Sequence, residues 1–454
     1  METHDDIQRS YLCIDLKSFY ASVECVDRHL DPLTTNLVVA DESRTDKTIC
    51  LAVSPALKAQ GVRNRCRLFE VPQSLRAQTV VAPPRMARYI EKSAEIYGVY
   101  LRWLSPDDIH VYSIDEAFMG VTPYLDLYGC SARELGERIR ADVTATTGIP
   151  ATCGLGTNLF LAKVALDITA KHAADFFGQL DEQSYRATLW AHQPITDFWH
   201  VGPGTARRLA EMGLHTMGQV ALSPTEPLFK AFGIDAEILI DHAWGIEPVR
   251  ISDIKAYRSR AHSLSTAQVL GHDVDHNDAL LIAKEMVDAL VLELVSQRLV
   301  AKSLSLALGY SASPELRAAV RAEMQSAPAG QHGYYWRFGE TFEHGGVTFV
   351  VPTSSRATII DELVRLFDRV EVRHQPIHRL MVSLGDVTDE DAQGLQQSLF
   401  SNPEAEERER RRQEAVNAVR AKFGKNSLLR AMDLMPEATA RERNAQIGGH
   451  RSGN

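Results

Sequence analysis

Two neighbouring carboxylates, Asp115 and Glu116, interrupt a segment that otherwise has the composition of a β-strand, HVYSIDEAFMGV at residues 110–121. Buried carboxylates are costly unless a partner neutralises them, and a metal ion is one such partner. A third carboxylate, Asp15, ends the predicted first strand, SYLCIDL, just before a turn into a helix. If both segments are neighbouring strands of one sheet, the three side chains meet at one edge. The alternative is a turn in which Asp115 and Glu116 face water.

Such a cluster repels itself unless cations bind, and hard oxygen ligands with room for water and phosphate favour Mg²⁺. Two ions roughly 3.5–4 Å apart would activate a hydroxyl and stabilise a leaving pyrophosphate, which is the two-metal scheme for nucleotidyl transfer. The carboxylate that bridges both ions would be Asp15 or Asp115. The carboxylates therefore predict a site that uses two Mg²⁺ ions.

The composition is that of a globular protein, with 454 residues, 44% hydrophobic and 24% charged. This length predicts roughly three or four domains. No segment approaches the roughly 20 apolar residues that span a bilayer, and the start METHDDIQRS lacks a secretory signal, so we expect a cytosolic protein without a membrane partner. The cysteines form no C-x-x-C pair, which predicts reduced thiols and no structural zinc.

The net charge of -10 argues mildly against nucleic acid as a partner. Local charge is more informative, because residues 41–76 hold seven Lys or Arg against four Asp or Glu. An acidic chain of this kind can still present a basic strip.

The first 172 residues alternate between strand-like and helix-like segments, which predicts an α+β domain with one central sheet. The helices include residues 85–103 and SARELGERIRADVTATTG, with Ser131 as the N-cap and Gly148 at the C-terminal end. Residues 37–53 are expected to form two strands joined by a polar loop.

From about residue 173 the pattern changes to short helices broken by Gly and Pro. Within it, VGPG at residues 201–204 is a tight turn in which Gly202 and Gly204 leave backbone N–H groups open to a phosphate. Together with MGLHTMGQVA it has the pattern of a helix-hairpin-helix, and the alternative is a plain helical hairpin.

Residues 252–262 are expected to be a polar linker, followed by strands and two amphipathic helices in the order β-α-β-β-α-β. In KSLSLALGY, Leu304, Leu306 and Leu308 alternate with small residues, which predicts one core face and one small, polar face. That second face could lie on a sugar-phosphate backbone or simply face water. Beyond residue 390 we expect a tail with a solvated, charged helix.

Four motifs in this order, CIDLKSFYASVE, YSIDEAF, TCGLGTNLFLAKVALD and FWHVGPGTARRLAEMGL, resemble those of the Y-family DNA polymerases of the UmuC and DinB type. The resemblance covers roughly residues 10–390. AVSPALKAQGVRNRCRLFEVP and the terminal ARERNAQIGGH are most similar to the UmuC-like UV-damage repair polymerases of Gram-positive bacteria.

The resemblance implies an α+β, multidomain right-hand polymerase with a ferredoxin-like palm, small fingers, a helix-hairpin-helix thumb and a β-α-β-β-α-β little finger. The corresponding segments are 1–19 and 85–172 (palm), 20–84 (fingers), 173–250 (thumb), 258–390 (little finger) and 391–454 (tail).

The resemblance also implies roles at the metal site. Asp15 and Asp115 would bind both metals, Glu116 would bind the catalytic metal, and the carbonyl of Leu16 would complete a site. Lys17 departs from the DinB-type motif, which has Asp there, but that Asp is not needed for the metals.

Further residues would bind the incoming nucleotide. Tyr20 would be the steric gate that excludes a ribose 2′-hydroxyl, and Phe19 would pack beneath the sugar; outside this frame, such an aromatic pair is more often core. Lys163 would reach the triphosphate as a point charge. Lys58 lies in SPALK, where relatives carry Arg in a YEAR-like motif, so Arg65 or Arg63 would compensate.

The implied activity is template-directed DNA synthesis of the low-fidelity translesion type, without proofreading, in SOS repair and damage tolerance. The substrates would be primer-template DNA and deoxynucleoside triphosphates, and the location would be the nucleoid in a bacterial cytoplasm. QQSLF resembles the sliding-clamp motif through Gln396, Leu399 and Phe400. A recombinase filament or accessory subunits remain open as partners.

Two rival functions have distinct signatures. A nucleotide cyclase shares a carboxylate pair on a sheet, but it is disfavoured by the helix-hairpin-helix and little-finger patterns. A non-catalytic DNA-binding accessory would require loss of Asp15, Asp115 or Glu116, and all three are present.

Overall fold

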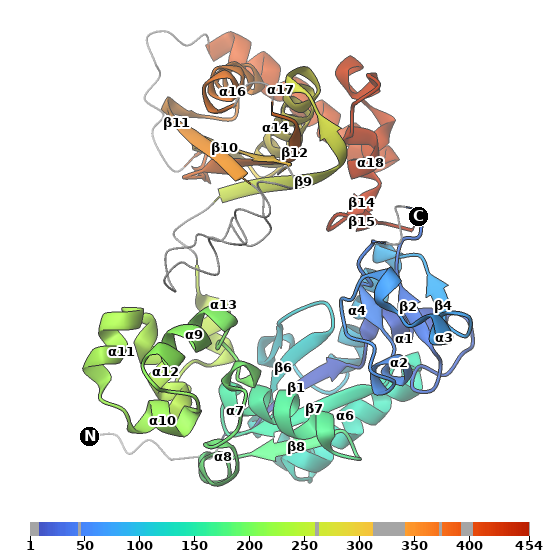
Figure 1. Cartoon of the computed structure of the whole chain (residues 1–454), viewed down its shortest axis with the longest axis vertical. Helices are drawn as coiled ribbons and strands as arrows, with labels where there is room; N and C mark the ends of the chain where they lie inside the picture. Colours follow the sequence, from blue (N-terminus) through green and yellow to red (C-terminus); the bar gives the residue numbers. More distant parts are fainter. Residues whose placement is uncertain are drawn as a thin grey trace. The chain divides into compact units, whose positions relative to one another are not determined.

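The computed structural model describes residues 9–43, 47–258, 263–311, 341–371, 375–391 and 403–453 (Figure 1). The chain forms two compact units, residues 1–257 with 451–454 and residues 258–450. No helix within the described ranges is long and apolar enough to cross a membrane.

The first unit is organised around a five-stranded sheet with the order β5-β6-β1-β7-β8. The strands are Ile109–Val111 (β5), Glu116–Gly120 (β6), Tyr11–Leu16 (β1), Ala151–Gly156 (β7) and Phe177–Leu180 (β8). β1 is antiparallel to both β6 and β7, and β8 is parallel to β7. The predicted central sheet is confirmed, but β8 lies beyond residue 172, where the sequence predicted the palm to end.

Helices cover both faces of this sheet. α6 (Ala132–Thr147) begins at Ser131, whose hydroxyl accepts from the Glu134 N–H, and ends at Gly148 with φ 71°, as predicted. α6 and the adjacent α4 (Met86–Tyr100) lie on one face, and α7 (Leu159–Val164) lies on the other. A Cβ on Gly154 or Gly156 would come within 2.2 Å or 2.1 Å of the α7 backbone, so these glycines let α7 approach the sheet closely.

A small lobe follows α1 (Phe19–Val26) along the chain. Its three-stranded sheet has the order β3-β2-β4, from Ala52–Val53 (β3), Leu37–Val39 (β2) and Val80–Ala82 (β4). The expected strand pair is confirmed as β2 and β3. The lobe has its own buried cluster, which includes Val38, Leu57 and Leu68, and two short helices, α2 (Pro55–Ala59) and α3 (Gln73–Arg76).

Short helices follow β8, as the Gly and Pro pattern predicted. They are α8 (Glu182–Leu189), α9 (Pro203–Glu211), α10 (Met217–Leu222), α11 (Thr225–Phe232) and α12 (Asp235–Trp244). The predicted linker is partly wrong, because Ile251–Ala256 forms helix α13. Ile251 packs against Tyr11 and Phe118 of the first sheet, and this burial stabilises a helix that its polar composition did not reveal.

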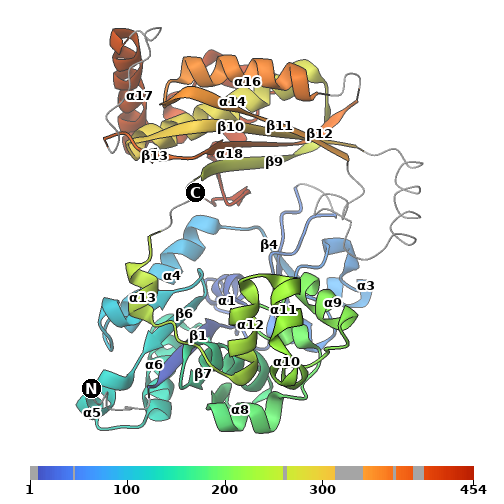
Figure 2. The ribbon, with the colours of Figure 1, turned by 90° about the vertical axis from the view of Figure 1, so that its left-hand side faces the viewer.

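The second unit contains the predicted β-α-β-β-α-β order. Its sheet, β11-β10-β12-β9, comprises Thr341–Thr353 (β11), Leu299–Tyr310 (β10), Ile377–Gly385 (β12) and Ser263–Val274 (β9), with β13 (Thr388–Asp389) paired to β10. α14 (His276–Ser296) and α16 (Arg356–Val370) cover one face (Figure 2). The alternation in β10 is confirmed, since Leu304, Leu306 and Leu308 are buried while Ser305 is exposed.

The charged helix expected after residue 390 is present, and it packs on the second unit. α17 (Pro403–Phe423) contacts α14, where Asn417 Nδ2 donates to the Leu292 carbonyl at 2.9 Å. Further on, α18 (Ala440–Asn444) brings Arg443 to 3.4 Å from buried Glu285, and β14 (Gln446–Ile447) pairs with β15 (His450–Arg451). A backbone carbonyl of α14 therefore holds α17, and a buried carboxylate of α14 holds α18.

Candidate active site

The three predicted carboxylates meet at one end of the β1–β6 pair. Asp15 lies directly opposite Glu116 in the antiparallel register, and Asp115 precedes Glu116 in the turn from β5. The Leu16 N–H donates to the Asp115 carbonyl at 2.9 Å, which fixes this turn against β1. Ser113 Oγ donates to Asp115 Oδ1 at 2.7 Å. Asp115 thus occupies a turn and Glu116 a strand, and both side chains are partly buried rather than turned to water.

The electrostatics of Asp15 reflect this clustering. Burial and the nearby carboxylates of Asp115 and Glu116 raise the pKa of Asp15 to about 7, although Lys171 and Lys163 oppose the shift. The site therefore disfavours three negative charges on its own. A divalent cation would remove that penalty, and carboxylate oxygens are donors that Mg²⁺ prefers.

Glu116 is engaged by two side chains. Lys163 Nζ donates to Oε2 at 2.8 Å, and Cys13 Sγ donates to Oε1 at 3.1 Å. Within the described residues, no group of three or more His, Cys, Asp or Glu side chains is arranged to hold a metal ion. To coordinate a metal ion, the Glu116 carboxylate would have to give up its hydrogen bond from Lys163.

Lys163 lies at the end of α7 with an almost buried side chain, between Glu116 and Asp167, whose Oδ2 is 2.9 Å from Nζ. Burial lowers the pKa of Lys163, but the two carboxylates outweigh it and leave the pKa raised. The structure therefore places this ammonium on the carboxylate cluster, and its predicted triphosphate contact remains a prediction.

Other cations surround Asp15, and sequence reasoning missed one of them. Lys171 is half-exposed and lies eight residues after Lys163, about two helical turns further along the same segment. Burial lowers the pKa of Lys58, and among the nearby charges Asp15 raises it while Lys171 lowers it further. Burial likewise lowers the pKa of Lys17; Asp15 raises it, and Lys58 and Lys171 lower it further.

Two of these lysines have further contacts. Lys58 Nζ donates to Ser18 Oγ at 2.9 Å, and Lys17 Nζ lies 3.6 Å from the centre of the Phe176 ring. Lys17 departs from the family motif at a position that contributes positive charge. Lys17, Lys58 and Lys171 form what we call the lysine cluster.

Tyr20 and Phe19 begin α1 directly after Ser18, whose φ of 46° lies in the left-handed region and turns the chain out of β1. Phe19 is buried, whereas Tyr20 is half-buried. Burial and Asp115 raise the pKa of Tyr20, and Arg65 opposes them. The predicted gate therefore lies within electrostatic reach of Asp115 and of exposed Arg65.

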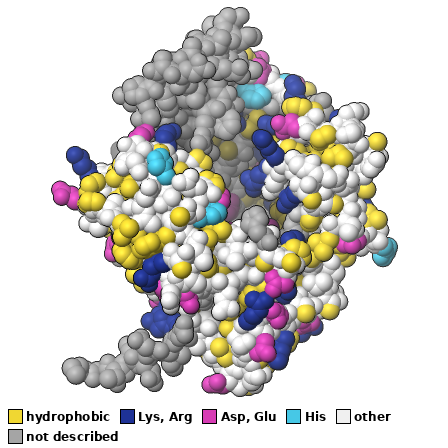
Figure 3. Space-filling model, turned by 60° about the horizontal axis from the view of Figure 1, so that its bottom comes forward, with side chains coloured by type: hydrophobic (Ala, Val, Ile, Leu, Met, Phe, Trp, Pro, Cys, Tyr) yellow, Lys and Arg dark blue, Asp and Glu magenta, His cyan; other side chains and the backbone are white. Residues whose placement is uncertain are grey.

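The turn before α9 has the predicted form. Gly202 is the N-cap of α9, no side chain caps it, and a Cβ on Gly202 or Gly204 would meet nothing within 4 Å. The space on the Cβ side of both glycines is therefore open. The face drawn in Figure 3 is hollowed near its middle, and Lys and Arg side chains gather along one side of the hollow. Gln396, Leu399 and Phe400 lie outside the described residues.

Comparisons with known proteins show which family the chain belongs to. The model of the impB/mucB/samB family matches residues 14–167, and the model of the C-terminal domain of that family matches residues 261–399. The chain is 30% identical over 449 residues to the putative UV-damage repair protein UvrX of Bacillus subtilis, which covers 98% of each chain. It is 29% identical over 440 residues to DNA polymerase IV 2 of the same organism, covering 96% and 97%.

Among solved structures, a Y-family DNA polymerase chimera of Dbh and Dpo4 matches with a TM-score of 0.61 and 20% identity. The match covers 84% of this chain and 99% of the chimera, and it shows that the fold is shared.

Proposed function

This chain belongs to the impB/mucB/samB family and is a DNA-directed DNA polymerase of the Y-family translesion type, and from that premise we propose that Asp15, Asp115 and Glu116 carry its nucleotidyl transfer. Low-fidelity synthesis in DNA damage tolerance is its function. The observation that carries the proposal is the strand register, in which Asp15 of β1 lies opposite Glu116 of β6, with Asp115 directly before it.

Two Mg²⁺ ions would be held by Asp15 and Asp115, with Glu116 and the Leu16 carbonyl as further ligands. Bound there, the ions would activate the primer hydroxyl and stabilise the leaving pyrophosphate. The raised pKa of Asp15 supports this proposal, because burial first, and then the charges of Asp115 and Glu116, disfavour an ionised Asp15 without a cation.

The lysine cluster would receive the triphosphate. Lys171 lowers the pKa of Asp15, and Asp15 raises the pKa of Lys58. A triphosphate bound near Asp15 would therefore be attracted by both ammonium groups. Lys163 would help to hold Glu116 in place and release it when a metal binds. Arg65, close to Tyr20, could reach the same nucleotide.

Tyr20 would discriminate against ribonucleotides through its half-buried ring, which lies within electrostatic reach of Asp115. Phe19, which is buried next to it, would support the sugar from below. Gly202 and Gly204 would hold a phosphate of primer-template DNA through backbone N–H groups.

The partners would be primer-template DNA, deoxynucleoside triphosphates and, through Gln396, Leu399 and Phe400, the sliding clamp. The site of action would be the chromosome in the bacterial cytoplasm.

A primer-extension assay tests the proposed catalytic site. Undamaged and abasic templates are copied with Mg²⁺ and all four deoxynucleotides by the wild-type protein, by Asp115→Asn and by the control Asp126→Asn, which changes an exposed carboxylate. We expect extension by the wild type and the control, and a loss of about 1,000-fold or more in Asp115→Asn, because the metals act on the transition state. Wild-type extension by Asp115→Asn, with DNA binding intact, would overturn the assignment.

A further inference from the structure

The proposed gate residue is stacked on a second tyrosine. The ring centres of Tyr20 and Tyr89 are 4.4 Å apart, and the ring planes differ by 14°. Tyr89 comes from α4 and is fully buried, whereas Tyr20 begins α1 and is half-buried. One face of the Tyr20 ring is therefore covered by a side chain that cannot easily move.

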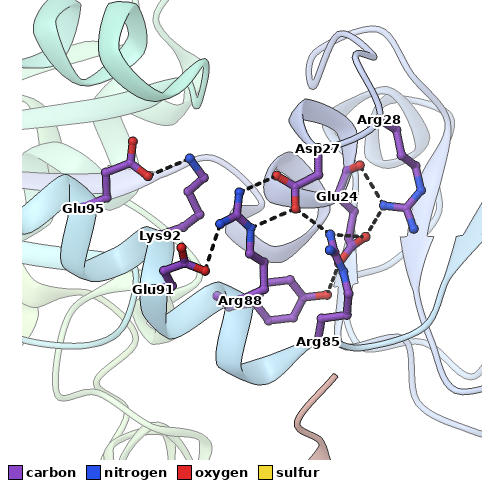
Figure 4. Close-up of polar contacts among 9 residues, drawn as sticks. Glu24, Asp27, Arg28, Arg85, Arg88, Glu91, Lys92 and Glu95 are labelled. Carbon is purple, nitrogen blue, oxygen red and sulfur yellow. Dashed lines mark hydrogen bonds and ion pairs between the residues drawn. The ribbon is translucent and has the colours of Figure 1, made fainter. Parts of the chain in front are cut away.

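Tyr89 is itself held by a buried carboxylate. Its hydroxyl donates to Glu24 Oε1 at 2.7 Å, and Glu24 is fully buried on α1. Arg85 binds both Glu24 oxygens, with Nε at 2.9 Å from Oε1 and Nη2 at 3.0 Å from Oε2, and Arg28 also pairs with Glu24. Figure 4 shows Glu24 with Arg85 on one side and Arg28 on the other. A buried carboxylate in such a fork has little freedom, because breaking the pair leaves a buried charge.

Ion pairs of the same kind continue to the end of α1. Arg85 Nη2 also donates to Asp27 Oδ2 at 2.7 Å, and Arg88 donates to both Asp27 oxygens at 3.0 Å and 2.8 Å (Figure 4). Tyr20, Glu24 and Asp27 are spaced at i, i+4 and i+7, so they share one side of α1. That whole side is fastened to the first turns of α4.

An ion-pair network alone would explain how α1 and α4 are held together. It would not require an aromatic ring laid flat on Tyr20. A half-exposed tyrosine changes rotamer readily unless a neighbour restricts its ring, and the Tyr89 ring removes that freedom on one face. The hydroxyl of Tyr89 in turn fixes its own ring to Glu24.

We propose that Tyr89 is a positioning residue that sets the plane of the Tyr20 ring, and that Glu24 and Arg85 hold Tyr89 in place. The selection against ribonucleotides then depends on Tyr89, a residue that need not touch the nucleotide. This inference rests on the proposed role of Tyr20 as the sugar gate.

The test is single-nucleotide insertion opposite an undamaged template base, with kcat/KM measured for a deoxynucleotide and for the matching ribonucleotide. Tyr89→Leu removes the stacked ring, and we expect the ratio of ribonucleotide to deoxynucleotide insertion to rise about 3- to 10-fold, the size of a lost aromatic pair. Tyr89→Phe keeps the ring and should leave the ratio near that of the wild type. If Tyr89→Leu does not fold, Tyr89→Met removes the same ring with a more adaptable side chain.

Combining Tyr89→Leu with Tyr20→Ala separates positioning of the Tyr20 ring from general destabilisation of the fold. Tyr20→Ala should raise the ratio sharply, and adding Tyr89→Leu should change it no further, because the ring to be positioned is gone. Tyr185→Leu is the matched control, since Tyr185 is another fully buried tyrosine of the first unit that packs against Phe160 and Phe198. It should lower stability without moving the ratio.

The outcomes distinguish the two proposals. If Tyr20→Ala leaves the ratio unchanged, the proposed gate is wrong and the inference falls with it. If Tyr20→Ala raises the ratio but Tyr89→Leu or Tyr89→Met does not, the gate stands and the positioning role is overturned. Equal changes in Tyr89→Leu and Tyr185→Leu would also overturn it.

Discussion

Lys163 and Lys171 share one carboxylate: Nζ of Lys163 lies 2.9 Å from Asp167 Oδ2, and Nζ of Lys171 lies 2.7 Å from Asp167 Oδ1. The first ammonium is nearly buried and also binds Glu116, whereas the second is half-exposed. The two lysines should therefore have different functions, although both lie on one short segment.

We expect Lys171→Ala to weaken nucleotide binding, because an exposed cation near Asp15 is available to the triphosphate. Loss of one charge-assisted contact corresponds to a rise of about 10- to 100-fold in KM for the deoxynucleotide. Steady-state kinetics measure this change. Lys92→Ala, which removes a lysine paired with Glu95 on α4, is the charge-matched control.

Lys163→Met should instead lower stability by about 3–5 kcal/mol, because it leaves the nearly buried Glu116 without its cation, whereas Asp167 keeps Lys171. Urea denaturation measures this loss. The opposite result would be a rise in KM as large as that of Lys171→Ala, with a free energy of unfolding equal to that of the wild type. In that case Lys163 contacts the triphosphate, as the family resemblance implies, and the division of roles is wrong.

The turn before α9 should bind DNA without sequence preference. Gly204→Val places a bulky side chain beside open N–H groups, so we expect weaker primer-template binding on every sequence tested, since phosphate contacts carry no base information. Fluorescence anisotropy at several salt concentrations measures the affinity. Binding equal to that of the wild type, with circular dichroism unchanged, would rule out this role.

The clamp motif makes a separate prediction. Replacing Leu399 and Phe400 by Ala removes two large apolar side chains, each worth about 1.5–3 kcal/mol when buried at an interface. We expect no detectable clamp binding by titration calorimetry. Extension of short primer templates without the clamp should continue at the wild-type rate, and unchanged clamp affinity would reduce QQSLF to a linker.

The ion pairs of Asp27 predict a pH-dependent contribution to stability. Hydrogen bonds from Arg88 and Arg85, opposed by burial, lower the pKa of Asp27 from 3.8 to about 2. This contribution is fully present above the unfolded pKa of 3.8 and is lost as the pH falls through about 2. Asp27→Asn should therefore lower the free energy of unfolding by about 2 kcal/mol at pH 7 and by about half that at pH 3.

Urea denaturation followed by tryptophan fluorescence measures this difference. Trp103, Trp190, Trp199 and Trp244 all lie within residues 1–257, so their signal reports chiefly on the unit that contains Asp27. Asp126→Asn is the control. A difference for Asp27→Asn that stays constant between pH 7 and pH 3 would contradict the assigned pKa.

Local patterns predicted most of the elements. The caps of α6, the strand with Asp15, the hairpin at Asp115 and the alternation in β10 follow from residue types within one segment. They could be predicted because turn chemistry and apolar periodicity act over a few residues.

Contacts between distant segments could not be predicted in this way. Ile251 makes α13 a helix by packing on the first sheet, and Arg443 reaches Glu285 from far along the chain. The sequence does carry one sign of such a contact at Glu24, because a single carboxylate within the apolar segment FYASVECV requires a partner. The identity of that partner, Arg85 with Tyr89, depends on where α4 lies.

The close approach of α7 to β7 has a consequence for the tolerance of this gene to mutation. An alanine at position 154 or 156 would bring its Cβ within 2.2 Å or 2.1 Å of backbone atoms, which no rotamer can relieve. Every codon change away from glycine at these two positions should therefore be eliminated by selection for function. The helix that carries Lys163 is thus held at a fixed distance from the sheet that contains Asp15. Neutral mutations can change the exposed surface of this helix, but they cannot change its distance from the sheet.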